Sequence, residues 1–381
     1  MPHAAPEPSP VPLRTPQPAP LRSPLRAAVV GCGDIATQHL AAIRALADRG
    51  PAGRGIVHLG AVVDPDRRRR EEAAAAHGVP GYETLGELIA AGRADVVHLC
   101  TPHSEHARLA EQALEAGVHV LTEKPVAHRL GDAERLIGTA DRAWSERGTQ
   151  LGVCFQNRYN APVVAMRELL DGGSLGAVLG AQATVMWHRP AEYYAARPWR
   201  GTWEGSGGGL LMNQAIHTLD LLQWLVGPAR VVDGRASARA LGGIIEVEDT
   251  ADIVLEHAAH DGGAHPGAQH APRVRSVFFA TNANGLNAPV TLDIQTERAE
   301  LSLRGALTVR HADGRADVVD EAGVLPGDRS YWGASHRLLV ADFYRALLAG
   351  DRFWIGAREA SESLRLIKDV YSRSYAPGEW L

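Results

Sequence analysis

Hydrophobic positions in the first part of the chain fall into short continuous runs separated by stretches with helical spacing. The runs have the length of buried strands and cover residues 27–30, 57–63, 95–100, 118–121 and 151–155. Between them, apolar residues recur at helical spacing, as in the stretch from Ser104, which can cap a helix, to Gly117, and in residues 129–144. Buried strands that alternate with helices are typical of a parallel sheet. We therefore predict a doubly wound α/β domain that closes near residue 155.

A glycine-rich turn directly follows the first of these runs. Gly31 and Gly33 lie in this turn, and Ala36 stands where the third glycine of a dinucleotide fingerprint usually lies. Such a turn exposes unpaired backbone N–H groups at a helix N-terminus, and its missing side chains let a diphosphate approach. The alternative is an ordinary glycine turn, but a strand before it and a helix after it favour dinucleotide binding.

The second run ends at an acidic residue, Asp64, which lies 33 positions after Gly31. A carboxylate at this tip typically binds the ribose hydroxyls of NAD at a spacing of about 20 residues, and the loop of residues 50–55 accounts for the excess. The arginines at 67–70 could instead receive the 2′-phosphate of NADP. However, the first two of them precede two glutamates by four residues, so they can pair along a solvated helix face. Because Asp64 would also repel a phosphate, we expect NAD rather than NADP.

Lys124 stands at the C-terminal tip of the run 118–121, where an open parallel sheet binds its ligands. Pro125 fixes the chain after it and the flanking residues are apolar, so the side chain emerges from a packed edge rather than as a generic surface cation. Partial burial and a nearby positive nicotinamide would both lower the pKa of the lysine. A lysine in this position is a usable acid or base near neutral pH.

Residues 207–227 predict a helix with two different faces. One face is apolar and is expected to pack on a sheet, with Ala215, Leu219, Leu222 and Val226. The opposite face gathers an amide, an imidazole, a carboxylate and an indole, from Asn213, His217, Asp220 and Trp224. We expect either Asn213 or Asp220 to reach His217 along the helix and to fix its tautomer. The alternative is a surface histidine with polar neighbours.

Beyond residue 227 the pattern changes to alternating runs, which predict a largely antiparallel open sheet. The strands are expected at 231–241, 248–256, 274–280, 290–297 and 300–303, with 177–187 as their first partner. Two helices are expected to close the chain, at 336–348 and 357–371. The stretch 257–273 contains four histidines (257, 260, 265 and 270) at irregular spacing without cysteine. We therefore expect an exposed loop there and no metal site.

Composition narrows the class of protein. With 381 residues, of which 45% are hydrophobic, the chain can bury two cores, and its net charge of −5 argues against a nucleic-acid surface. No run approaches the roughly 20 apolar residues of a membrane span. The three widely spaced cysteines, Cys32, Cys100 and Cys154, indicate buried side chains in a reducing compartment, not a disulfide or zinc framework. Residues 1–24 hold nine prolines and lack the apolar segment of a secretory signal, which predicts a disordered tail on a cytoplasmic protein.

Taken in order, these motifs resemble the Gfo/Idh/MocA oxidoreductases, the family of glucose–fructose oxidoreductase and inositol dehydrogenase. The resemblance covers nearly all of the chain past the tail and rests on Gly31 to Ala36, Thr101-Pro102-His103 with His106, Glu123-Lys124-Pro125, Phe155 to Tyr159, Trp199-Arg200, and Gly207 to Gly227. It implies an N-terminal Rossmann domain over residues 25–155 that binds NAD. It also implies an α/β domain over residues 156–381, which binds substrate, joins a homodimer or homotetramer, and can pack its last helices back on the first domain.

The resemblance also implies roles for individual residues. The cofactor would be contacted by the glycine turn, by strand tips and by a Trp-Arg pair, namely by Gly31, Gly33, Asp34, Ile35, Asp64, Thr101, His106, Glu123, Lys124, Trp199 and Arg200. Lys124 would reach both the nicotinamide ribose and the substrate, and His217 would be the acid/base on the reacting hydroxyl. The substrate pocket would be lined by Gln156, Asn157 and Asp220. Asn213 replaces the family's usual aspartate four residues before the histidine, so it can hold a hydroxyl but cannot relay a proton.

We therefore expect an NAD(H)-dependent dehydrogenase that acts on a sugar, cyclitol or sugar derivative. Hydride would pass from the substrate to the nicotinamide while the hydroxyl proton leaves to His217 or Lys124, and alignment of the two reactants would supply much of the rate. Two other functions stay open: a glycosidase that uses tightly held NAD for transient oxidation, and a non-catalytic NAD-binding sensor. Net release of NADH separates the dehydrogenase from the glycosidase, and the presence of both Lys124 and His217 speaks against the sensor.

Overall fold

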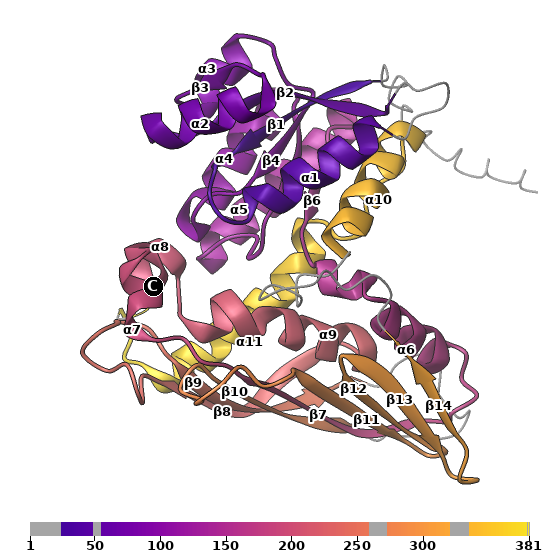
Figure 1. Ribbon diagram of the computed structural model, residues 1–381. Helices are drawn as coiled ribbons and strands as arrows, with labels where there is room; N and C mark the ends of the chain where they lie inside the picture. The colour runs from indigo at the N-terminus through magenta and orange to yellow at the C-terminus, as the bar shows by residue number, and fades with distance from the viewer. Residues whose placement is uncertain (1–23, 49–54, 259–272, 321–334, 379, 381) are drawn as a thin grey trace, which may run out of the picture.

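The computed structural model describes residues 24–48, 55–258, 273–320, 335–378 and 380. It consists of two units, one built on a six-stranded sheet and one on an eight-stranded sheet whose helices lie between the two sheets (Figure 1). Nearly all of the tail expected over residues 1–24 and most of the loop expected over 257–273 lie outside the described residues. Among the helices that the structure describes, none has the length and apolar character needed to cross a membrane.

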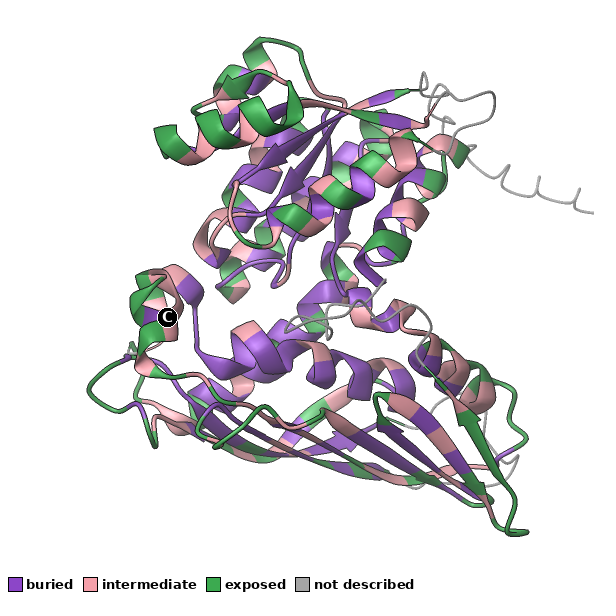
Figure 2. Cartoon of the chain, in the orientation of Figure 1, coloured by how far each residue is buried: buried purple, intermediate pink, exposed green. Residues whose placement is uncertain are grey.

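The first sheet is parallel throughout, with strand order β3-β2-β1-β4-β5-β6. Its strands are β1 (Leu25–Val30), β2 (Val57–Val63), β3 (Gly81–Tyr82), β4 (Val96–Leu99), β5 (His119–Thr122) and β6 (Leu151–Val153). Its helices are α1 (Ala36–Ala47), α2 (Arg67–His77), α3 (Leu85–Ala90), α4 (His103–Glu115) and α5 (Leu130–Arg147). Strands β4 and β5 are buried along their whole length, as a sheet covered on both faces requires (Figure 2). The predicted doubly wound sheet is confirmed, and the strand order reverses between β1 and β4, where such sheets bind ligands.

The second sheet has the order β14-β13-β12-β11-β7-β10-β9-β8, and only β7 and β10 run parallel within it. Its strands are β7 (Val178–Met186), β8 (Ala229–Ser237), β9 (Thr250–His257), β10 (Val274–Thr281), β11 (Thr291–Thr296), β12 (Ala299–Arg304), β13 (Ala306–His311) and β14 (Ala316–Val319). Ala183, Leu292 and Leu303 pair across it in one buried row, whereas Val277 in the neighbouring row is 54% exposed. One face of the sheet therefore packs on helices and the other faces outward, as predicted for a largely antiparallel open sheet.

The part of the chain that follows β6 adds further helical segments. They are η2 (Gln156–Tyr159), α6 (Ala161–Asp171), α7 (Ala191–Ala195), η3 (Pro198–Gly201), α8 (Trp203–Ser206), η4 (Leu211–Ala215), α9 (Ile216–Val226), α10 (Ser335–Ala349) and α11 (Ala357–Ser374). Helix α10 packs against α1 of the first unit, and α11 contacts α5 as well as α9 and β8 (Figure 1). The end of the chain thus joins the two units.

Two helix predictions need correction. Ser104 does not cap α4, because the helix begins at His103 and Pro102 occupies the cap position without a side-chain hydrogen bond. The single helix predicted over 207–227 is divided into a π-helical turn, η4, and the regular helix α9. A π-turn inserts extra residues into the helical repeat, so a constant 100° spacing cannot describe which side chains share a face across it.

Two predictions in the second sheet also need correction. The strand expected over 231–241 ends at Ser237, because the Asp249 carboxylate accepts hydrogen bonds from three successive backbone N–H groups at 239–241 and turns the chain. His257, expected in an exposed loop, closes β9 instead and is buried between the Gly227 carbonyl and the Ser276 hydroxyl.

Candidate cofactor and substrate site

The glycine turn between β1 and α1 leaves open space at the N-terminus of a helix. Gly31 has φ +90°, and a Cβ atom there would lie 2.6 Å from the Cys100 carbonyl oxygen, so only glycine fits. A Cβ atom on Gly33 would meet nothing within 4 Å. Ile35 occupies the helical N-cap without a side-chain bond to the first-turn N–H groups. This open space, lined by backbone donors, fits a cofactor diphosphate.

Asp64 is held rigidly above this turn. Its Oδ2 accepts a hydrogen bond from the Cys32 backbone N–H at 2.8 Å, and its Oδ1 accepts one from the Asp66 backbone N–H at 2.8 Å. The side chain is 5% exposed. Each carboxylate oxygen keeps a further acceptor position, so the group is preorganised to receive ribose hydroxyls.

The four arginines after Asp64 are all engaged in contacts. Arg67 and Arg68 form ion pairs with Glu71 and Glu72, as the sequence spacing predicted. Of the remaining two, Arg69 Nε lies 3.5 Å from Asp64 Oδ1, and the last arginine of the run donates to the Asp64 carbonyl at 2.7 Å. Half of the run thus lies on a solvated helix face and half supports the strand tip.

Lys124 connects the first unit to the helical layer of the second. Its Nζ donates a hydrogen bond to the backbone carbonyl of Asn213 at 2.6 Å. Burial lowers its pKa to about 8, a shift that the Glu123 charge opposes and the Arg200 charge reinforces. The ammonium is therefore poised to lose a proton slightly above neutral pH.

His217 lies close enough to Lys124 for their charges to interact. Burial, followed by the charge of Lys124, holds the pKa of His217 well below its usual range. The imidazole is therefore neutral at pH 7 and can accept a proton. Its Nε2 lies 3.5 Å from Gln156 Nε2, and its ring packs edge-on against Phe155. The predicted Gln156 thus lies beside the predicted acid/base, and Asn157 is partly exposed on the same η2 turn.

The expectation that Asn213 or Asp220 fixes the His217 tautomer is wrong. Asn213 donates from Nδ2 to the Tyr193 hydroxyl at 3.3 Å, because the π-turn directs it away from the histidine. Asp220 accepts hydrogen bonds from Arg158 on both of its oxygens, at 2.7 and 2.8 Å. His217 Nδ1 is buried and has no hydrogen-bond partner among the described residues.

Asp220 is also a poor candidate for a substrate ligand. The side chains of Arg158 and Asp220 are each 2% exposed, and Ser363 adds a further bond to the carboxylate. The guanidinium also lies 5.4 Å from the ring centroids of Trp224 and Trp354. The geometry assigns this pair to the joint between η2, α9 and α11, not to the substrate pocket.

His106 and Glu123 are buried behind the expected cofactor position. The ring nitrogens of His106 lie 2.7 Å from the Pro125 carbonyl and 2.9 Å from the Thr101 carbonyl. Glu123 is 5% exposed and accepts from histidines of two other helices. Both side chains thus make contacts within the protein that position the backbone around Lys124 and Thr101.

A pair from the second unit reaches over the glycine turn. Trp199 packs edge-on against His103 with ring centroids 4.9 Å apart, and Arg200 Nη2 lies 3.6 Å from Asp34 Oδ2. Arg200 also covers the ring of Tyr193 at 4.4 Å. Sequence reasoning missed Tyr193, and only its place in an aromatic stretch before Trp199 hinted at it.

Some of the buried polar atoms that lack a partner belong to residues predicted to bind ligands. Within the described part of the chain, buried atoms without a hydrogen-bond partner include Thr101 Oγ1, Gln156 Oε1, Arg200 Nε and His217 Nδ1. Buried polar groups normally find partners, so these atoms indicate places where a bound molecule completes the set. Together with the open turn at Gly33 and the oriented Asp64, they fit a dinucleotide and a polar substrate.

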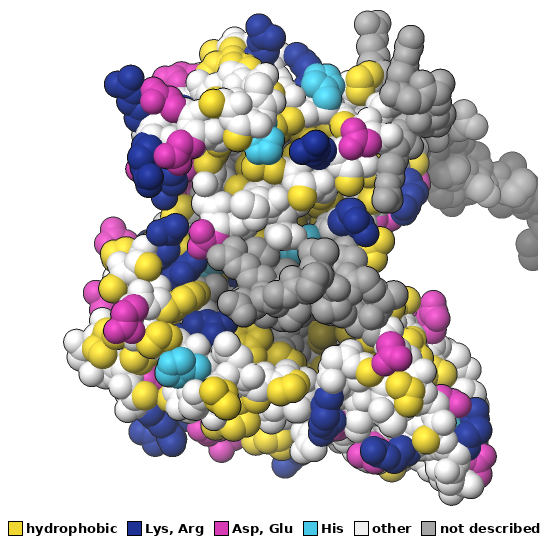
Figure 3. Space-filling model, viewed as in Figure 1, with side chains coloured by type: hydrophobic (Ala, Val, Ile, Leu, Met, Phe, Trp, Pro, Cys, Tyr) yellow, Lys and Arg dark blue, Asp and Glu magenta, His cyan; other side chains and the backbone are white. Residues whose placement is uncertain are grey.

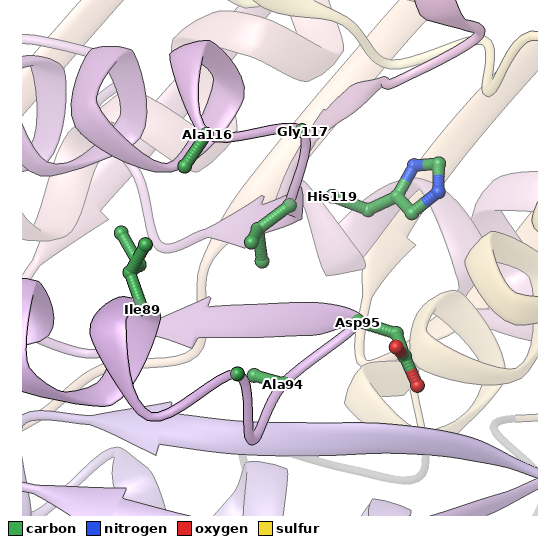
Figure 4. A pocket seen from close by; sticks show the side chains of 8 residues that line it. Ile89, Ala94, Asp95, Ala116, Gly117 and His119 are labelled. Atoms are coloured by element: carbon green, nitrogen blue, oxygen red, sulfur yellow. The ribbon is translucent and has the colours of Figure 1, made fainter.

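The pocket drawn in Figure 4 lies at the opposite edge of the first sheet. It has a volume of about 260 Å³ and is lined by residues at and before the starts of β4 and β5, among them Asp95 and His119. Because these are the amino ends of the strands, the pocket is remote from the glycine turn. The face seen in Figure 3 intersperses basic and acidic side chains and gathers no basic patch.

Comparison with known proteins adds two family matches. The Gfo/Idh/MocA model described as an oxidoreductase family with an NAD-binding Rossmann fold matches residues 25–146. The model of the Gfo/Idh/MocA C-terminal domain matches residues 163–265.

Individual relatives agree with these matches. The WlbA dehydrogenase of Bordetella pertussis, solved with NADH and UDP-GlcNAcA, is 30% identical over 91% of this chain and 95% of its own, with a TM-score of 0.73. Levoglucosan dehydrogenase of Pseudarthrobacter phenanthrenivorans is 25% identical over 75% of this chain and 79% of its own length. D-apiose dehydrogenase of Paraburkholderia graminis is 28% identical over 61% of this chain. Four of the curated relatives are matched over only 37 to 57% of their own length.

Proposed function

We propose, because the chain belongs to the Gfo/Idh/MocA oxidoreductase family, that it is an NAD(H)-dependent oxidoreductase acting on a hydroxyl or ketone carbon of a sugar, cyclitol or sugar derivative. The observation that carries this proposal is that Lys124 of the first unit and His217 of the second lie close enough for their charges to interact. The substrate class is supported by relatives named levoglucosan dehydrogenase and D-apiose dehydrogenase, and by the WlbA dehydrogenase solved with UDP-GlcNAcA.

The protein side of the reaction follows from the state of these two groups. His217 is neutral at pH 7 and accepts the proton of the reacting hydroxyl, or returns it in the reverse direction. Lys124 donates hydrogen bonds that hold the same oxygen and the cofactor ribose. The bound nicotinamide supplies the hydride acceptor or donor. Asn213 holds a hydroxyl but cannot exchange a proton, so the proton stays with His217 and Lys124.

The site residues divide between the two units. We propose that residues 25–155 hold NAD through Gly31, Gly33, Asp34, Asp64 and Thr101, with Trp199 and Arg200 closing over it. Residues 156–381 supply Gln156 and Asn157 to the substrate. The outward face of the second sheet would join a homodimer or homotetramer, and its exposed Val277 and Val318 support this role. The three free cysteines fit a reducing, cytoplasmic compartment.

NAD is the proposed cofactor in preference to NADP. Asp64 is fixed by two backbone donors, so it cannot swing away from a 2′-phosphate. Titration of NADH and NADPH against wild type and Asp64→Ala tests this preference. Tighter binding of NADH by wild type, with the preference lost in the variant, is expected. Tighter binding of NADPH by wild type would instead assign the 2′-phosphate to Arg69.

The function is tested by incubating the purified protein with NAD and a panel of sugars, cyclitols and sugar derivatives while the absorbance of NADH is followed. Net NADH formation with at least one substrate is expected. Bond cleavage without net NADH would indicate the glycosidase alternative. Cofactor binding without turnover on any member, under conditions in which related dehydrogenases are active, would favour a sensor.

A further inference from the structure

A series of hydrogen-bonded buried side chains runs from helix α10 to Glu123, the residue that precedes Lys124. Tyr344 Oη lies 2.9 Å from His98 Nε2, and His98 Nδ1 lies 2.8 Å from His39 Nδ1. His39 Nε2 lies 3.1 Å from Glu123 Oε1. The residues come from α10, β4, α1 and the end of β5, and the first three side chains are fully buried.

The chemistry of these groups determines which atom donates in each of these hydrogen bonds. Burial alone would raise the pKa of Glu123, but hydrogen bonds from His336 and His39 hold it well below the ordinary value, so Glu123 is an ionised acceptor. His39 therefore carries its proton on Nε2 and accepts at Nδ1. His98 must then carry its proton on Nδ1 and accept at Nε2.

Tyr344 is the first donor of the series, because its hydroxyl donates to His98. Burial raises the pKa of Tyr344 well above its usual range and lowers that of His98 well below its own, so the first stays protonated and the second neutral. Among the described residues, His98 is the one hydrogen-bond partner of Tyr344 Oη. The reverse direction, with His39 doubly protonated, would leave this buried hydroxyl hydrogen without an acceptor.

We propose that Tyr344, His98 and His39 form a one-directional hydrogen-bond chain that locks Glu123 as an anion beside Lys124, and that this anion governs the protonation of Lys124. The proposal rests on the proposed function in that Lys124 is the group so tuned. Glu123, His39, His98 and Tyr344 are positioning residues, because none of them touches the reacting atoms. If the lock is released, His39 can carry its proton on Nδ1 instead, and Glu123 then loses one of the two histidine hydrogen bonds that hold it ionised, which favours its protonation.

Other charged and titratable groups also act on this pair. Besides Glu123, Lys124 faces Arg200 of η3, His217 of α9, His103 and His106 of α4, and Cys154 just after β6. Glu123 also faces His336, Cys100 and Cys154. Of these groups, Glu123 is the anion that acts directly on Lys124, and it opposes both burial and the charge of Arg200.

A divalent cation is the competing explanation for the cluster of His39, Glu123 and His336, whose donor atoms lie within 4.8 Å of one another. However, both histidine nitrogens already lie at hydrogen-bond distance from the same carboxylate oxygen, at 3.1 and 3.3 Å. Hydrogen bonds account for this arrangement without a further ligand, so we favour them.

The pKa of Lys124 can be measured directly, because Lys124 and Lys368 are the only two lysines in the polypeptide. Lysine labelled with ¹³C at Cε gives two side-chain signals, and Lys124→Met assigns them. Titration of the intact protein without substrate then reads the pKa of each lysine. Lys368 serves as an internal control, because it interacts with a different carboxylate, Glu248.

Each glutamate substitution is expected to change mainly the titration midpoint of the lysine beside it. Glu123→Gln lowers the midpoint of Lys124 by roughly one unit, the size typical of losing an adjacent opposite charge, and leaves Lys368 unchanged. Glu248→Gln lowers the midpoint of Lys368 by more than that of Lys124. Tyr344→Phe, which is nearly isosteric, lowers the midpoint of Lys124 by a smaller amount because it releases the lock.

The histidine tautomers of wild type give a further test, in which variants serve only to assign the signals. Long-range ¹⁵N spectra of labelled histidine, assigned with His39→Gln and His98→Gln, are expected to show His39 protonated on Nε2 and His98 on Nδ1. The opposite tautomers would overturn the proposed direction of the hydrogen bonds. So would an unchanged Lys124 midpoint in Glu123→Gln or in Tyr344→Phe, or a midpoint in wild type that moves when EDTA removes a bound cation. Because no substrate is present, failure of the proposed function leaves these results readable.

Discussion

Lys124 donates a hydrogen bond from Nζ to the backbone carbonyl of Asn213, across the boundary between the two sheets, at 2.6 Å. The only other lysine of the chain, Lys368, donates to the Gly207 carbonyl at 2.8 Å. The two lysines therefore hold both ends of the segment that leads into the π-turn and His217. Glu248 holds its middle by accepting from the Gly209 and Leu211 N–H groups. His217, the candidate acid/base, is thus positioned by the hydrogen-bonded segment 207–213, not by neighbours on its own helix.

Substitution of His217 separates chemistry from cofactor binding. His217→Asn should lower turnover by roughly 10²- to 10⁴-fold, because it removes a positioned proton acceptor. The affinity for NAD should stay almost unchanged, since the histidine reaches the site from the second unit. Turnover and NADH titration measure the two effects. A loss of NAD affinity as large as the loss of turnover would place His217 on the cofactor instead.

Asn213→Asp tests whether a proton relay can be restored. The new carboxylate would accept from the Tyr193 hydroxyl, where Asn213 now donates to it. It would also lie near Lys124, whose pKa should rise because an opposite charge favours the ammonium. We expect activity to be kept and the limb of the pH profile near pH 8 to move to higher pH. An unchanged profile would show that this position does not communicate with the titrating group.

Asp220→Ala tests the assignment of Asp220 to a structural ion pair. Removal of one partner leaves Arg158 buried without its main counter-charge, and such changes cost about 3–5 kcal/mol of unfolding free energy. Asp171→Ala, which removes the exposed partner of Arg167, should cost at most about 1 kcal/mol. Denaturant unfolding measures both. An Asp220 variant with wild-type stability but a large rise in KM would return Asp220 to the substrate pocket.

Lys368 makes stability depend on pH in a defined direction. Burial lowers the pKa of Lys368 to about 8 from an unfolded value of 10.5, so the unfolded state binds more protons between these values. Its contribution is fully present above pH 10.5 and is lost as the pH falls through about 8. The unfolding free energy of wild type minus that of Lys368→Met should therefore rise from pH 8 to pH 10.5, by up to about 3 kcal/mol. A difference that is flat or falls over this range would contradict the shift.

Local sequence signals sufficed for the elements that carry continuous apolar runs. The strand predicted at 57–63 matches β2, and the glycine turn and Asp64 lie where the fingerprint predicts. These features depend on burial and backbone geometry within a few residues of one another. The strand tip carrying Lys124 follows from the same logic.

Features that depend on distant parts of the chain were not predictable from local patterns. The π-turn at Leu211–Ala215 is braced by Glu248 and Lys368, which lie far away in sequence. Asp220 looks like an active-site carboxylate on a helical wheel, and only its partner Arg158 shows otherwise. Strands β13 and β14 were both missed, and β14 is short and almost entirely exposed, so it lacks a hydrophobic signature.

The most direct test of the account compares wild type with Lys124→Met on a substrate identified with NAD. Methionine keeps the apolar stem and removes only the charge and the proton. We predict that NADH formation falls by roughly 10²- to 10⁴-fold while NAD affinity weakens only modestly. NADH formation by Lys124→Met at a rate near that of wild type would contradict the central claim that the reaction takes place at Lys124 and His217.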